Sequence, residues 1–186
     1  MAISPAAIRL ISFAWGFAEA TFFFFVPDLW LTYLVLVNRG EGYKNIPFVI
    51  AGALTGGALM YVFGSESFAT ARVFLDAVPA ISPALIDSAG EEMRAGNALA
   101  VMQAGSLSGV PYKIYAAVAG DMGLAVPLFA FYTVIARGVR FLLVTSLASL
   151  VGSALLIRYN LRAILIVNTG CWVVFYSFYF YIFSQT

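Results

Sequence analysis

Long apolar stretches alternate with short polar ones along almost the whole chain. A membrane-spanning helix needs about 20 consecutive apolar residues, and most of these stretches approach or exceed that length. The alternation divides the chain into an apolar segment 10–37, a span 46–63, a polar amphipathic connector 65–97, an interrupted apolar segment 98–119, a long apolar segment 124–157 and a last span 163–183. It predicts an all-α integral membrane protein in which residues 1–186 form a single membrane domain.

The first apolar segment, 10–37, is longer than one span but shorter than the roughly 40 residues that two spans and a turn require. Pro27 lies inside it, and proline breaks a helix by removing an N–H and clashing with the preceding turn. We predict a re-entrant hairpin that turns near Pro27 and Asp28, because non-helical backbone is tolerated at membrane depth where it lines a protein cavity. One long, kinked helix is the alternative. The Ala18-Glu19-Ala20 sequence matches a signal-peptidase site, but the apolar run continues past it, so we expect no cleavage.

The segment 98–119 predicts a second re-entrant hairpin. Its apolar run is interrupted between Gly105 and Lys113, where Gly109 and Pro111 mark a turn. Neither arm is long enough to cross a bilayer alone.

The segment 124–157 would be about 51 Å long as one helix, well beyond a hydrocarbon core of about 30 Å. Arg137 and Arg140 interrupt it. We predict one long helix, tilted or broken, whose arginines face the protein interior. Two short spans with surface arginines are the alternative. Aromatic residues concentrate toward the end of the last span, 163–183, and favour an anchor at the membrane interface.

The two remaining segments have simpler interpretations. Gly52 and Gly56 form a G-x-x-x-G pattern in the span 46–63, which is typical of closely packed helices. The connector 65–97 carries most of the acidic residues, and its pattern indicates an amphipathic helix at the interface with a solvated charged face.

Composition supports a membrane protein and excludes several classes of site. The chain is 62% hydrophobic and 10% charged, with a mean hydropathy of +0.94, whereas soluble domains are about a quarter charged. A net charge of +1 offers no basic surface for nucleic acid. With no histidine and one cysteine, the chain has no internal disulfide, no Cys/His zinc site and no histidine-based triad. We expect no metal or other cofactor and no enzymatic activity.

Basic residues predict the orientation. If the first segment is a hairpin and 124–157 crosses once, Arg9, Arg39, Lys44, Arg158 and Arg162 share one side and the acidic connector lies opposite. The positive-inside rule assigns the basic side to the cytoplasm. The order is then a hairpin and a span entering from one side, followed by a hairpin and a span entering from the other. This is an inverted repeat, an arrangement that places transport sites near the membrane midplane.

The charged residues within apolar segments are the candidate functional groups: Glu19, Asp28, Lys113, Arg137 and Arg140. Such residues mark functional sites by default. Burial favours the protonated form of a carboxyl group, so we predict that the two acids couple protons or steer a headgroup. The three bases suit a phosphate, for which arginine offers paired donors. A structural ion network is the alternative. Candidate pocket-lining residues are Tyr61, Gln103, Ser106, Ser108, Pro111 and Tyr112.

These motifs resemble the DedA/VTT (SNARE-associated Golgi protein-like) membrane family, in particular its short YqaA-like bacterial branch. The resemblance rests on Glu19 before an aromatic run and Pro27-Asp28, on the glycine-rich span Gly52–Gly64 that ends Tyr61-Val-Phe-Gly64, on Gly109-Val-Pro111-Tyr-Lys113 followed by Ala119-Gly120, and on Phe129 with Arg137-Gly-Val-Arg140. The motifs are individually loose, and their order covers residues 10 to about 155.

The resemblance implies two facing re-entrant hairpins and a role in moving lipids across membranes. Bacterial members recycle undecaprenyl phosphate, with proton-motive force implicated, and eukaryotic relatives scramble phospholipids. The family's functional acids would fall on Glu19 and Asp28, and its hairpin base on Lys113. Many members carry an arginine where this chain has Ser106-Leu107-Ser108, so the site would use Arg137 or Arg140 instead, or take a different substrate.

The sequence thus predicts a multi-pass lipid translocase of the inner (plasma) membrane. Its substrate would be a phosphate-bearing lipid, such as undecaprenyl phosphate or a phospholipid. Whether protons drive it and whether it forms homo-oligomers stay open. A proton-coupled transporter of a small solute and a non-catalytic membrane assembly protein are the alternatives.

Overall fold

The structure, a computed structural model, describes residues 4–183 as an assembly of helices, with no strand in that range. The helices are α1 (Pro5–Thr21), α2 (Asp28–Val37), α3 (Arg39–Glu66), α4 (Phe68–Asp76), α5 (Pro83–Ala95), α6 (Ala98–Ser108), α7 (Tyr112–Asp121), α8 (Val126–Leu155) and α9 (Leu161–Phe183). The predicted all-α fold is confirmed.

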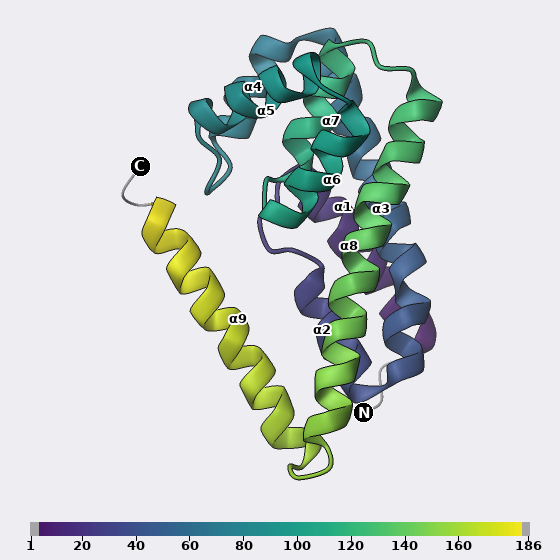
Figure 1. Cartoon of the computed structure of the whole chain (residues 1–186). Helices are drawn as coiled ribbons and strands as arrows, with labels where there is room; N and C mark the ends of the chain where they lie inside the picture. Colours follow the sequence, from purple (N-terminus) through teal and green to yellow (C-terminus); the bar gives the residue numbers. More distant parts are fainter. Residues whose placement is uncertain (1–3, 184–186) are drawn as a thin grey trace.

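Three helices, α3, α8 and α9, are long and apolar enough to cross a membrane. In Figure 1, α3 and α8 run through the body of the molecule, whereas α9 diverges from it after the turn that follows α8. The fold is therefore that of a membrane protein with three candidate spanning helices. The segment 124–157 was predicted as one long helix that is either tilted or broken. In the structure α8 is continuous, so the helix is not broken. This long apolar helix accommodates Arg137 and Arg140 because each guanidinium pairs with a carboxylate of another helix.

The span predicted at 46–63 is longer in the structure. Only Asn38 separates α2 from α3, and its side chain caps α3 by accepting a hydrogen bond from the Glu41 N–H at 3.2 Å. Residues 39–45, which lie before the predicted span, form the first turns of α3, and Pro47 lies within the helix.

The connector 65–97 forms two helices, α4 and α5, instead of one amphipathic helix. The chain turns between them at 77–82, a stretch that contains Pro79, and Pro83 occupies the first turn of α5. Leu75, Ile86 and Met93 are fully or almost fully buried in the main core. The connector therefore packs on the protein as well as exposing a charged face.

Two pairs of short helices each contain a non-helical break. Residues 22–27 separate α1 from α2, and residues 109–111 separate α6 from α7. Gly109 has a φ of +99°, a left-handed conformation that glycine adopts without steric cost. In Figure 1 each pair reverses direction at its break, and both breaks lie near the middle of the molecule.

Helix α3 packs closely against both pairs through glycines. A Cβ on Gly52 would lie 2.0 Å from the Phe13 carbonyl oxygen of α1, and one on Gly64 would lie 2.0 Å from the Ala117 carbonyl oxygen of α7. Backbones can approach this closely only where the side chain is a hydrogen atom. The glycine pattern thus forms helix contacts, as predicted, and α3 fixes the positions of α1 and α7.

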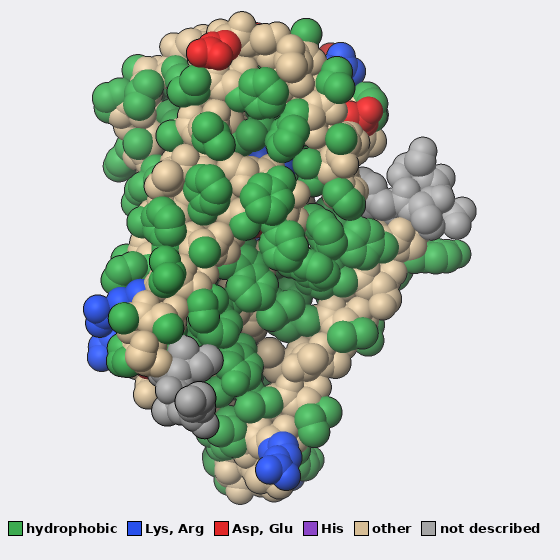
Figure 2. Space-filling view, turned by 180° about the vertical axis from the view of Figure 1, so that it is seen from behind, with side chains coloured by type: hydrophobic (Ala, Val, Ile, Leu, Met, Phe, Trp, Pro, Cys, Tyr) green, Lys and Arg blue, Asp and Glu red, His purple; other side chains and the backbone are tan. Residues whose placement is uncertain are grey.

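Charge is distributed unevenly along the molecule. The α2–α3 and α8–α9 junctions, which are rich in basic residues, lie at one end, and α4 and α5 lie at the other. Figure 2 shows acidic side chains, with basic ones among them, at the α4–α5 end, and basic side chains at the opposite end.

Candidate functional site

Lys113 connects the two helix breaks. It lies in the first turn of α7, two residues after Pro111, and is 1% exposed. Its Nζ donates a hydrogen bond to the Phe23 carbonyl oxygen at 2.7 Å. That oxygen belongs to the break after α1, where the end of a helix leaves carbonyl groups without helical partners. The lysine thus satisfies an acceptor that the first break exposes.

Glu19 and Arg137 form a buried ion pair between α1 and α8. The Arg137 Nη2 donates to Glu19 Oε2, and the side chains are 5% (Glu19) and 3% (Arg137) exposed. The Arg137 guanidinium also lies over the rings of Tyr112 and Phe141, 5.2 and 4.8 Å from their centroids. Its Nε has no hydrogen-bond partner. Aromatic faces and one carboxylate therefore surround this arginine, and one of its donors stays free.

Asp28 and Arg140 form a second buried pair between α2 and α8. The Arg140 Nε and Nη2 both donate to Asp28 Oδ2, at 3.0 and 2.7 Å. The Arg140 Nη1 donates to the Ser106 carbonyl oxygen of α6. Asp28 is 1% exposed, yet its Oδ1 has no partner. The pair thus joins the first helix pair to the second and leaves one carboxylate oxygen unused.

The cluster has more bases than acids. Its charged members are Glu19, Asp28, Lys113, Arg137 and Arg140. Each acid pairs with an arginine, and within residues 4–183 Lys113 forms no ion pair. One positive charge is therefore in excess inside an apolar protein, where an unpaired charge is costly. An anion in this place would offset that cost.

A cavity of about 230 Å³ opens beside these charges. Glu19, Lys113, Arg137 and Arg140 all border it. The rest of its wall comes from both helix breaks, from the α4–α5 turn and from α9: Phe24, Val26, Val78, Pro79, Ile81, Ser108, Gly109, Val110, Pro111, Phe175, Tyr176, Phe178 and Tyr179. The cavity thus combines a cationic wall with apolar and aromatic ones.

Two of the six predicted pocket-lining residues border the cavity. Ser108 and Pro111 border the cavity. Ser106 contributes its carbonyl oxygen to Arg140, while its hydroxyl donates to the Ala136 carbonyl oxygen at 3.3 Å. Tyr112 lies beneath Arg137 without bordering the cavity, and its hydroxyl is 2.8 Å from that of Thr133.

Tyr61 and Gln103 lie outside the cavity wall. The Tyr61 hydroxyl donates to the Leu124 carbonyl oxygen at 2.6 Å, and its ring packs on Phe129. The Gln103 Nε2 is buried without a partner. Both were expected from their position in apolar segments, but helix rotation, which decides the direction of a side chain, turns them away from the site.

The contribution of α9 was not predicted from the sequence. The Tyr176 hydroxyl accepts a hydrogen bond from the Val26 N–H at 2.8 Å, inside the first break, and Tyr176 is 7% exposed. The aromatic run of α9 was assigned to a membrane interface, whereas part of it forms a wall of the site. Pro27 indicated that such a partner was needed, because a helix break frees backbone donors that must then find an acceptor.

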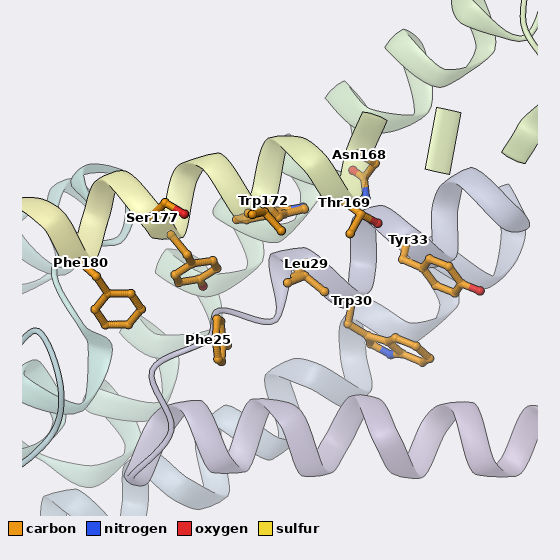
Figure 3. A pocket seen from close by; sticks show the side chains of 11 residues that line it. Phe25, Leu29, Trp30, Tyr33, Asn168, Thr169, Trp172, Ser177 and Phe180 are labelled. Carbon is orange, nitrogen blue, oxygen red and sulfur yellow. The ribbon is translucent and has the colours of Figure 1, made fainter. Parts of the chain in front are cut away.

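A second hollow, of about 530 Å³, lies between α2 and α9 (Figure 3). Figure 3 shows Leu29, Trp30 and Tyr33 of α2 on one side and Trp172 and Phe180 of α9 on the other. The complete lining is Phe25, Leu29, Trp30, Tyr33, Asn168, Thr169, Trp172, Val173, Tyr176, Ser177 and Phe180. We call this hollow the α2–α9 groove, and the first one the charged cavity.

Comparison of the chain with models of protein families, with curated proteins and with solved structures finds no match. The resemblance to the DedA/VTT family therefore stays a prediction from the motifs. Within residues 4–183, no group of three Asp, Glu, Cys or His side chains converges on a point where a metal ion would be held. The chemistry of the candidate site is that of its paired charges and of its surplus lysine.

Proposed function

We propose that this protein is a lipid translocase that moves a phosphate-bearing lipid across a membrane. The observation that carries the proposal is the surplus positive charge of Lys113 in a cavity that Arg137 and Arg140 also border. Three basic side chains around one small cavity suit a phosphate group, because arginine and lysine bind it with charge-assisted hydrogen bonds. The motif resemblance to DedA/VTT proteins supports the same function.

In this proposal the two broken helix pairs are re-entrant hairpins. The first, α1–α2, enters from the basic end and the second, α6–α7, enters from the acidic end, so that their breaks meet at the midplane. Together with α3 and α8 they form an inverted repeat, an arrangement known to place substrate sites between its halves. The positive-inside rule then orients the basic end toward the cytoplasm of an inner (plasma) membrane.

Glu19 and Asp28 give the proposal a route for proton coupling. Each holds an arginine that also borders the charged cavity. Protonation of Glu19 would remove the charge that pairs with Arg137 and free that guanidinium for a phosphate oxygen. Release of the phosphate would restore the ion pair and the ionised carboxylate. Substrate and proton would thus bind together and leave together.

Reconstitution of the purified protein into liposomes tests the proposal. A fluorescent polyprenyl phosphate and, separately, a fluorescent phospholipid are followed across the bilayer, with and without a pH gradient. We expect Lys113→Met to slow transport by about tenfold or more, equivalent to the loss of one charge-assisted hydrogen bond of about 1.4 kcal/mol or more. Lys44→Met is the matched control, since Lys44 is the chain's other lysine and is exposed on α3.

The outcomes separate the proposal from its alternatives. If neither lipid crosses faster than in protein-free liposomes, the translocase is refuted. Wild-type rates for Lys113→Met would show that the surplus charge has no role in transport. If neutralising all five clustered charges lowers only thermal stability, the cluster is a structural ion network and the protein fits an assembly role.

A further inference from the structure

The α2–α9 groove has walls suited to hydrocarbon. Phe25, Leu29 and Trp30 line one side, and Trp172, Val173 and Phe180 line the other. Three polar side chains of the groove, Asn168, Thr169 and Ser177, come from α9. Apolar grooves of this size are typical of ligand sites, where burial of nonpolar surface drives binding.

The polar atoms of the indole rings are bonded elsewhere. The Trp30 Nε1 donates to the Ser12 hydroxyl at 2.8 Å, and the Trp172 Nε1 donates to the Thr32 hydroxyl at 3.1 Å. Neither indole N–H is therefore available to a ligand in the groove. What the two tryptophans offer a ligand is apolar ring surface, which matches an alkyl chain better than a polar solute.

The groove adjoins the charged cavity. Tyr176 borders both, and the adjacent residues Phe24 and Phe25 border one each. The bond between the Tyr176 hydroxyl and the Val26 N–H fixes this shared wall to the first helix break. A molecule with an anionic end and a long apolar end would place the first beside Lys113 and extend the second along α9.

The groove also opens to the surroundings of the molecule. Figure 1 shows α9 leaning away from the bundle, and Figure 2 shows hydrophobic side chains in the hollow beside it. Only 11% of the apolar part of α9 is buried, so in a membrane most of that helix faces lipid. A lipid chain can therefore reach the groove sideways without crossing a polar surface.

From these contacts we infer that the α2–α9 groove binds the hydrocarbon chain of the lipid whose phosphate occupies the charged cavity. The inference rests on the proposed function and narrows its substrate class to long-chain phosphate lipids whose chain lies against α2 and α9. It also assigns α9 a direct role in substrate binding.

Photocrosslinking in phosphatidylcholine liposomes tests the inference. The probe is hexadecyl phosphate with a diazirine in its alkyl chain, and the labelled residues are mapped by mass spectrometry. We expect labelling of groove residues such as Trp30, Trp172 and Val173. Excess hexadecyl phosphate should suppress the labelling, whereas excess hexadecanol, which lacks the phosphate, should suppress it far less.

A pair of adjacent valines gives matched variants. Val173 borders the groove, whereas Val174 does not, and they are 60% and 69% exposed. Val173→Trp should lower groove labelling about tenfold, since displacing roughly two methylene groups removes that much binding free energy. Val174→Trp should leave it unchanged.

These experiments distinguish failure of the groove inference from failure of the proposed function. Equal labelling over both faces of α9, or no effect of Val173→Trp, would mean that the groove holds only bulk lipid, which refutes the inference whatever Lys113 does. Groove labelling that resists both Lys113→Met and excess hexadecyl phosphate would refute the phosphate site and hence the proposed function. Suppression by Lys113→Met and by Val173→Trp supports both.

Discussion

At the scale of single residues, the buried charges dominate this protein. In the Asp28–Arg140 pair, the cost of removing charges from water opposes the attraction between them. The Asp28 carboxylate is 1% exposed and uses only one oxygen in the pair. Desolvation of such a pair can cancel its attraction, yet removing one partner leaves a buried charge alone. The pair therefore constrains the chain strongly even if its net stabilisation is small.

Arg140→Met should destabilise the protein by about 3–5 kcal/mol, since it strands the Asp28 carboxylate in the interior. The double variant Asp28→Leu/Arg140→Met should recover most of that loss. Thermal unfolding in detergent measures both. The exposed pair Arg72–Asp87, whose side chains are 42% and 51% exposed, supplies the control: Arg72→Met should cost at most about 1 kcal/mol. Additive losses in the double variant would contradict this account.

At the scale of helices, glycine decides how closely the elements approach. Gly52 lies against α1, so close to the Phe13 carbonyl oxygen that no side chain fits between the helices. The same α1 carries Glu19 toward Arg137. The separation of α1 from α3 therefore helps to determine where one wall of the charged cavity lies.

Gly52→Ala should lower stability by about 2 kcal/mol, since overpacking forces backbone shifts. Gly138→Ala is the matched change in α8, where the new Cβ would find Ile50 Cδ1 as its nearest neighbour at an ordinary 3.7 Å. It should be neutral or stabilising by up to about 1 kcal/mol, because alanine is the better helix former. In thermal melts, only Gly52→Ala should lower the unfolding temperature, and equal decreases for the two variants would refute the packing argument.

At the scale of the whole molecule, the two ends differ in charge, and this difference predicts the topology. The α2–α3 and α8–α9 junctions lie at the basic end, and α5 lies at the other. If α3 and α8 cross the membrane, these ends face opposite compartments. The basic end should face the cytoplasm.

Single cysteines report this topology in a Cys171→Ser background. Lys44→Cys and Arg158→Cys should react with a membrane-impermeant maleimide from the cytoplasmic side, and Glu91→Cys from the other side. All three positions are exposed in the structure. Labelling of Arg158→Cys and Glu91→Cys from the same side would exclude a single crossing by α8.

The sequence by itself determined the helical membrane fold, the two breaks and the identity of the buried charges. These are local properties: the length of apolar runs, the helix-breaking effect of proline and glycine, and the presence of ionisable groups where water is scarce. The same reasoning placed Arg137 and Arg140 in the protein interior, where each pairs with an acid.

Only the tertiary structure decided which acid meets which base and what else surrounds them. Pairing depends on helix rotation and on distances between segments more than a hundred residues apart, as between Glu19 and Arg137. For the same reason Tyr61 and Gln103 turned out to lie outside the cavity, and Tyr176 inside its wall. The surplus charge of Lys113 likewise became visible only when its neighbours were known, because an unpaired charge is a property of an arrangement rather than of a residue.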